Sequence, residues 1–251
     1  MTMSLTSSQR QSPGQSPGQS PRQSPRQYLP HHRLRLALHR LKDGGGHPLL
    51  LLHGLGERSP ATLPAEYSSW PGPVHALDFT GHGESDLPRG GGYSCEFLMA
   101  DADIALAHLG PCTLSGRGIG GYVALLLAGA RPGEVRGAIV RDGPGLCGGG
   151  SAARSPYIPV PDLSQLAPPD PFAIAELAND VRPPSYASSF AMLASQHSDL
   201  DTPISVCCCE RPPWLSAVME LLSLEPVALE QALRQYAAMP APGMRSGPES
   251  A

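Results

Sequence analysis

The sequence lacks any segment that marks a membrane protein or a secreted protein. Its 251 residues contain no run of about 18 apolar side chains, and Met1–Pro30 has no apolar core long enough for a secretion signal. The six cysteines show neither Cys-x-x-Cys spacing nor the layout of a disulfide framework. We therefore expect a cytoplasmic protein with reduced thiols and with no metal or cofactor.

A strong charge of either sign is also missing. The chain has 18 Lys and Arg against 22 Asp and Glu, which gives a formal net charge of -4, and its basic residues are not gathered on one predicted helix. Proteins that bind nucleic acid usually present a basic patch or stripe. We therefore expect neither nucleic acid nor a membrane as a partner, and the sequence leaves the oligomeric state open.

Proline and glycine, in contrast, are abundant, with 29 and 28 residues. Four Gln-Ser-Pro repeats fall within residues 11–25, and such a segment buries too little apolar surface to offset its chain entropy. We predict a disordered tail over residues 1–30, one folded domain over residues 31–240 and a second disordered tail over residues 241–251. The first tail could serve as an arm that binds a protein partner.

Short apolar runs alternate with helical patterns along the predicted domain, which is typical of the α/β class, with a mostly parallel sheet covered by helices on both faces. The predicted strands are residues 33–39, 48–52, 74–78, 112–114, 135–140, 204–208 and 226–229. The predicted helices are residues 94–109, 121–130, 170–179, 186–196, 214–222 and 230–238. Residues 146–200 are rich in proline and are predicted to form a short lid insertion.

The glycine-rich turn between residues 114 and 121 is the most informative stretch. Gly116, Gly118 and Gly120 match the Gly-x-Ser-x-Gly elbow, in which a sharp strand-to-helix turn raises a nucleophile above the sheet. Gly118 stands at the tip of this turn and has no hydroxyl or thiol with which to attack a substrate. The pattern therefore predicts the elbow without its nucleophile.

Two further motifs occur in the order that such an elbow would require. His53-Gly54-Leu55-Gly56 follows one predicted strand, and Asp78-Phe79-Thr80-Gly81-His82-Gly83-Glu84-Ser85 follows the next. Together with the elbow, they resemble the α/β-hydrolase superfamily in its single-domain esterase, lipase and haloperoxidase branch. The resemblance covers about residues 34–230 and implies the α/β-hydrolase fold.

The resemblance also implies a ligand pocket around the elbow. In this superfamily two backbone N–H groups bind the oxyanion, and here they belong to Leu55 and Ile119. Ser115 lies on the strand before the turn, so we do not expect it to replace the nucleophile. We expect a small apolar or acyl-type ligand in a pocket lined by His53, Gly54, Leu55, Arg117, Gly118 and Ile119.

The acid and the base of the family's catalytic triad are not recognisable. Residues 209–212 resemble the family's Gly-Glu-Arg-Asp turn, but Pro212 replaces the final aspartate, which leaves Asp142 and Glu210 as candidate acids. The last of the nine histidines is His197, so none follows the predicted strand at residues 204–208. A serine hydrolase needs all three groups, and we therefore expect a degenerate triad.

Four hypotheses about function follow. The first is a non-hydrolytic or strongly impaired member that binds a small ligand. The second is a lyase or a cofactor-free oxygenase that takes its base from His53, His82 or Asp142. The third is an active hydrolase of carboxylic esters or related substrates, and it rests on the fold alone. The fourth is a protein-interaction module.

Overall fold

Seven strands form one mixed sheet in the computed structural model, which describes residues 25–88, 90–148 and 167–239. The strand order is β1-β2-β4-β3-β5-β6-β7; β2 pairs antiparallel with β1 and β4, and the remaining pairs are parallel. The strands are β1 (Arg26–His31), β2 (Leu34–Lys42), β3 (Leu49–Leu52), β4 (Val74–Leu77), β5 (Cys112–Arg117), β6 (Val135–Arg141) and β7 (Ile204–Cys207).

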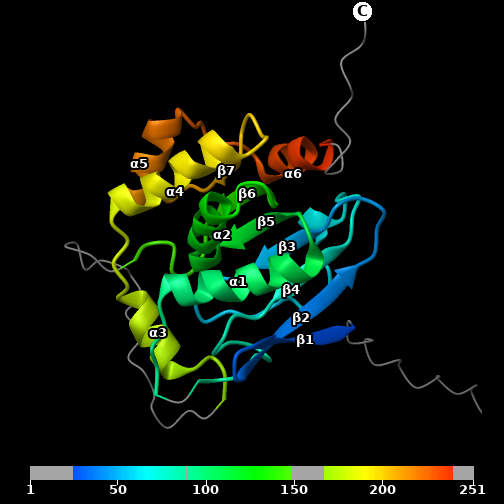
Figure 1. Cartoon of the computed structure of the whole chain (residues 1–251), viewed down its shortest axis with the longest axis vertical. Helices are drawn as coiled ribbons and strands as arrows, with labels where there is room; N and C mark the ends of the chain where they lie inside the picture. The colour runs from blue at the N-terminus through cyan, green and yellow to red at the C-terminus, as the bar shows by residue number, and fades with distance from the viewer. Residues whose placement is uncertain (1–24, 89, 149–166, 240–251) are drawn as a thin grey trace, which may run out of the picture.

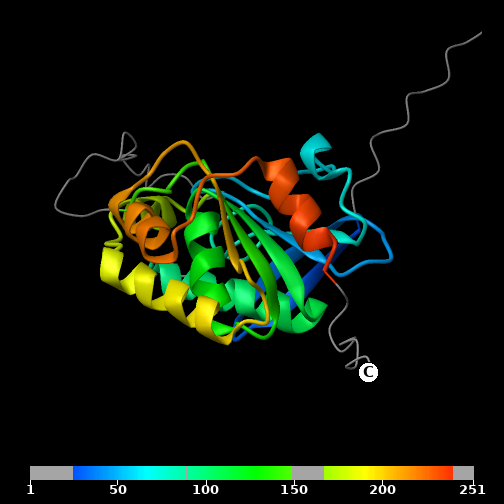
Figure 2. The same ribbon diagram turned by 90° about the horizontal axis from the view of Figure 1, so that it is seen from above.

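Helices cover both faces of this sheet, as the sequence predicts. Figure 2 shows α1 (Cys95–Leu109), α2 (Ile119–Ala130) and α4 (Pro184–His197) on one side and α6 (Leu229–Ala237) on the other. The helix α5 (Pro213–Leu222) packs against α4, and the single 3-10 turn η1 (Ala65–Tyr67) packs against α6. The arrangement confirms the predicted α/β-hydrolase fold.

The central strand β3 shows why both faces of the sheet must be covered by other elements. All four leucines of Leu49–Leu52 are buried. Leu50 and Leu52 belong to the core shared with α1, α2 and α5, whereas Leu49 and Leu51 belong to the core shared with η1 and α6. A continuous apolar run is typical of a parallel strand that is buried on both faces.

Two predictions made from the sequence near the ends of the domain are wrong. Strand β1 begins at Arg26, inside the predicted tail; Leu29 is buried and the Nδ1 atom of His31 lies 2.7 Å from a carboxylate oxygen of Asp101 on α1. Residues 226–229 do not form a strand, although Val227 donates one backbone hydrogen bond to Val206. Pro226 has no N–H group, which limits a ladder there.

The described part of the predicted lid forms two helices. One is α3 (Pro171–Ala178), which begins after Asp170, whose carboxylate accepts a hydrogen bond from the Phe172 N–H. Helix α3 lies beyond the ends of the parallel strands, away from the main helix layer (Figure 1). Helix α4, in contrast, packs against α2 and α5 and so belongs to that layer. Within the described ranges, no helix is both long enough and apolar enough to cross a membrane.

Candidate active site

The turn from β5 into α2 has the sharp geometry that the glycine pattern predicts. Gly118, at its tip, has φ 58° and ψ -122°, a conformation that strongly favours glycine. A Cβ atom on Gly116 would lie 2.1 Å from the Gly120 carbonyl oxygen, and one on Gly120 would lie 2.5 Å from the Leu52 carbonyl oxygen. All three glycines are therefore required by the close approach of the backbone.

The two amides assigned to the oxyanion hole converge on one oxygen atom of the chain itself. Leu55, in the loop after β3, and Ile119, the first residue of α2, each donate a backbone hydrogen bond of 3.0 Å to the carbonyl oxygen of Pro144. Pro144 lies in the loop after β6. The carbonyl thus stands where these two donors would hold the oxygen of a bound carbonyl compound.

The same carbonyl fills the space above the tip of the elbow. A Cβ atom on Gly118 would lie 2.0 Å from the Pro144 oxygen and 2.7 Å from the carbonyl carbon of Gly143. These atoms belong to the backbone, so a side chain at position 118 has no room unless this loop moves. One loop position therefore fills both the space that a side chain at position 118 would need and the point at which the Leu55 and Ile119 amides converge.

His53 is held by backbone groups through both of its ring nitrogens. Its Nε2 atom accepts the Phe79 N–H at 3.1 Å, so Nδ1 carries the proton and donates to the Gly54 carbonyl at 2.7 Å. Burial lowers the pKa of His53 below its ordinary value. The imidazole is therefore neutral and has no free nitrogen with which to take a proton.

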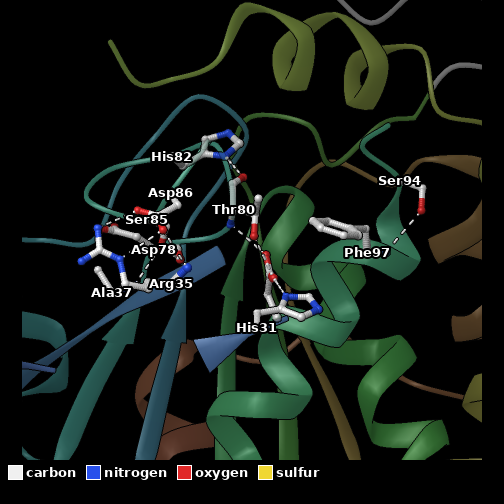
Figure 3. A network of polar contacts seen from close by, with 11 residues as sticks. His31, Arg35, Ala37, Asp78, Thr80, His82, Ser85, Asp86, Ser94 and Phe97 are labelled. Atoms are coloured by element: carbon white, nitrogen blue, oxygen red, sulfur yellow. Dashed lines mark hydrogen bonds and ion pairs between the residues drawn. The ribbon is translucent and has the colours of Figure 1, made fainter. Parts of the chain in front are cut away.

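His82 is held in the same way. Its Nε2 atom accepts the Gly56 N–H at 3.2 Å, and its Nδ1 atom donates to the Thr80 carbonyl at 3.1 Å, the contact drawn in Figure 3. Burial lowers the pKa of His82 to about 3. Both histidines of the family motifs therefore fasten loops at the strand ends.

The two candidate acids are neighbours through the Glu210 backbone, and within the described ranges no hydrogen bond or ion pair joins either carboxylate to a histidine. The carboxylate of Asp142 accepts the backbone N–H groups of Cys209 and Glu210, at 2.8 Å and 3.0 Å. It thereby joins the ends of β6 and β7. The side chain of Glu210 is exposed. Ser115 is buried on β5, where its hydroxyl lies 2.8 Å from the Tyr67 hydroxyl in η1.

A buried polar network supports the loop that carries His82. Asp101, which is fully buried on α1, accepts the N–H and the hydroxyl of Thr80 at 2.8 Å and 2.9 Å and also contacts His31 on β1. Figure 3 shows His31 and Thr80 meeting at this point. Asp78, at the end of β4, accepts the N–H groups of Ser59 and Glu84.

The sequence pattern did not single out Pro144 or Asp101, which complete this region. Gly143-Pro144-Gly145 begins two residues after the end of β6, the neighbour of the elbow strand, and this position was the available signal for a loop near the elbow. Over the described ranges, no group of three or more His, Cys, Asp or Glu side chains could hold a metal ion.

The comparisons with known proteins agree with this architecture. Residues 49–248 match the Alpha/beta hydrolase family. One relative is the (E)-2-((N-methylformamido)methylene)succinate hydrolase of Acinetobacter baylyi, which is 33% identical over 107 residues. That match covers 42% of this chain and 41% of the relative, so the chain spans about two fifths of the length of this curated relative.

Solved structures also resemble most of this chain, and two of them serve as examples. The thioesterase domain from the curacin biosynthetic pathway has a TM-score of 0.57 at 14% identity, over 86% of this chain and 96% of that one. A hypothetical protein from Pseudomonas aeruginosa PAO1 has a TM-score of 0.55 at 18% identity, over 84% of this chain and 96% of that one. At these identities the likeness concerns the fold alone.

Sheet order, elbow and family match together show that this chain belongs to the Alpha/beta hydrolase family.

Proposed function

We propose that this chain is a non-hydrolytic, or at most strongly impaired, member of the Alpha/beta hydrolase family. The observation that carries the proposal is the position of Pro144, whose carbonyl oxygen accepts the N–H groups of both Leu55 and Ile119. A substrate carbonyl would need these same two donors. The chain thus occupies its own oxyanion hole.

The cost of this arrangement to hydrolysis would be large. Removing one oxyanion donor from a serine hydrolase lowers turnover by about 10²- to 10³-fold, because the donors act on charge that develops in the transition state. Loss of the triad lowers turnover by about 10⁶-fold. Gly118 supplies no attacking group, and both ring nitrogens of His53 and His82 are bonded to backbone groups.

A small acyl-type ligand remains the class best suited to this site. Two N–H groups that meet at one point bind a single carbonyl oxygen, as they bind that of Pro144. The named substrate of the Acinetobacter baylyi relative carries a formamido group, which is of this kind. Such a ligand would replace the Pro144 carbonyl, so its binding would require the loop after β6 to move outward.

The test is hydrolysis of p-nitrophenyl butyrate by the purified chain and by the Gly118→Ser variant. We expect both rates to equal the background rate, because the new hydroxyl would have neither a base nor free oxyanion donors. Turnover by either protein that a serine-reactive phosphonate abolishes would contradict the proposal. An unrelated esterase, assayed in parallel, controls for the substrate and the inhibitor.

A further inference from the structure

A cavity of about 370 Å³ lies on the other face of the sheet from α2. Ser115 on β5, Leu51 on β3 and Ala76 on β4 contribute to its floor, and the loop between β3 and η1 contributes to its wall. Leu51 and Ala76 belong to the core on the η1 and α6 side. The cavity therefore opens on the face of the sheet opposite α2, and Leu52 and two residues of the predicted elbow pocket, His53 and Arg117, also line it where β3 and β5 end.

A cavity exists on this face because few residues cover the sheet there. Between β3 and β4 the chain forms only the three-residue turn η1 (Ala65–Tyr67), whereas the opposite face is covered by several full helices. Figure 2 shows η1 and α6 as separate pieces over the sheet. The loop that leads into η1 brings Pro60 and Pro64 to the wall, and these rigid residues add apolar surface.

Two arginines at the ends of neighbouring strands give the cavity its polar groups. Arg141, which ends β6, donates to the Tyr67 hydroxyl and places a second nitrogen 3.3 Å from a Glu66 oxygen. Arg117, which ends β5, donates through Nε to Glu57 at 3.0 Å and through Nη1 to the Asp142 carbonyl oxygen at 3.2 Å.

These bonds leave donors available. A guanidinium has five N–H groups, and the bonds of Arg117 use only Nε and Nη1, so its Nη2 amino group remains free in the described part of the chain. Tyr67 is buried, and because it accepts from Arg141, its proton is available for Ser115 or for another acceptor.

The charges around the cavity favour one anion. Its lining contains three arginines, Arg58, Arg117 and Arg141, and two carboxylates, those of Glu57 and Glu66. His53, which also lines it, is neutral because burial lowers its pKa. One positive charge is therefore not balanced by a lining carboxylate. Planar guanidinium groups suit carboxylates, which accept two parallel N–H bonds.

We propose that this cavity binds a small monocarboxylate with an apolar body. The carboxylate would contact Arg117 and Arg141, and the apolar body would pack against Leu51, Pro64 and Ala76. The proposal goes beyond the loss of hydrolysis and does not depend on it, because the cavity lies on the other face of the sheet from α2. Ligand binding here is measured without any turnover.

The experiment uses benzoate as the probe and benzamide as its uncharged counterpart, in a buffer free of carboxylates. Titrations of the full chain are followed by amide NMR and by calorimetry. We expect benzoate to shift the amides of Tyr67, Ser115 and Arg117 in a saturable manner and to bind at least tenfold more tightly than benzamide. Added salt should weaken benzoate binding, because charged contacts are screened.

Two variants and one matched control test the arginines. Arg141→Gln and, separately, Arg117→Gln are each expected to weaken benzoate binding at least tenfold. Arg131, which follows the end of α2 and pairs with Asp103 on α1, is about as exposed as Arg117, and Arg131→Gln should leave binding unchanged. Since Arg117 has no bond to Tyr67, its variant also tests the proposal if Arg141→Gln fails to fold.

Equal binding of benzoate and benzamide would overturn the proposal, and so would shifts confined to residues outside the cavity. The absence of any saturable shift would also overturn it. A result in which the chain hydrolyses esters but benzoate still shifts these amides would contradict only the proposed loss of hydrolysis. The two proposals can therefore fail independently.

Discussion

The carbonyl oxygen of Pro144 lies 2.0 Å from the position that a Cβ atom would occupy on Gly118. The two residues come from loops after neighbouring parallel strands, β6 and β5. The same oxygen accepts the N–H groups of Leu55 and Ile119. In this chain a loop of the protein therefore lies directly above the tip of the elbow, at the point where these two amides converge.

Gly118→Ala is expected to destabilise the protein. The new methyl group would meet the Pro144 carbonyl, and a residue with a side chain is strained at φ 58°. Backbone strain of this kind costs about 1–3 kcal/mol in the free energy of unfolding, before any clash is added. Chemical denaturation measures the loss.

The matched control for this substitution is Gly133→Ala, since a Cβ atom on Gly133 would meet nothing within 4 Å. Its free energy of unfolding should stay within about 0.5 kcal/mol of the parent value. Equal stability of the two variants would mean that the loop after β6 does not rest on the elbow.

Asp142→Asn tests whether the candidate acid has a structural role. The half-buried carboxylate accepts two backbone N–H groups from the turn after β7, and an amide side chain offers only one oxygen. We expect a loss of about 1 kcal/mol in the free energy of unfolding, which is less than the roughly 1.5–3 kcal/mol typical of hydrogen bonds to a charged group, because solvent screens part of the charge. Glu210→Gln, at an exposed side chain, should change stability very little. Equal effects would contradict the structural role.

The stability of the protein should fall as the pH drops below about 6.5, in part because of His82. An unfolded chain protonates this imidazole near pH 6.5, whereas burial keeps the folded pKa at about 3. The unfolded state therefore binds more protons between these pH values, and the free energy of unfolding falls by about 1.4 kcal/mol per pH unit once the pH is well below 6.5.

His82→Gln isolates this contribution. Urea denaturation at pH 7, 6 and 5 should show a shallower pH dependence for the variant than for the parent, whereas His108→Gln, at an exposed position, should keep the parent dependence. Parallel curves for the parent and His82→Gln would show that His82 titrates normally in the folded protein.

Asp101→Ala should loosen the attachment of β1. The buried carboxylate accepts hydrogen bonds from Thr80 and contacts His31, so its removal leaves buried donors without a partner. The cost should be about 3 kcal/mol. Amide exchange in β1 should also become faster. Asp103→Ala, which breaks only the exposed pair with Arg131, should cost at most about 1 kcal/mol.

Much of the fold was predictable because its signals are local. A continuous apolar run identifies β3, and Ser94 caps α1 where the helical pattern begins, its side chain accepting the Phe97 N–H. Strand β1 was not predictable, since few of its side chains are buried and it follows directly on the Gln-Ser-Pro repeats.

The sequence predicted only part of the candidate site. The resemblance assigned Leu55 and Ile119, and the structure brings their amides to one point. The Pro144 carbonyl, which accepts both hydrogen bonds, was not predicted. The contact joins loops after three different strands, and no local sequence pattern encodes how close the loop after β6 comes to the elbow. The cavity next to η1 was not predicted either. It exists because the three-residue turn covers only a small part of this face of the sheet, and the sequence does not show that.

Two amides donate hydrogen bonds to one carbonyl at the elbow, and NMR scalar couplings across hydrogen bonds observe such contacts directly. We predict couplings from the amide nitrogens of Leu55 and Ile119 to the carbonyl carbon of Pro144, together with slow exchange of both amide protons. If both couplings are absent and both amides exchange at the rate of unprotected groups, the two donors are free, which contradicts the proposal that Pro144 occupies the site.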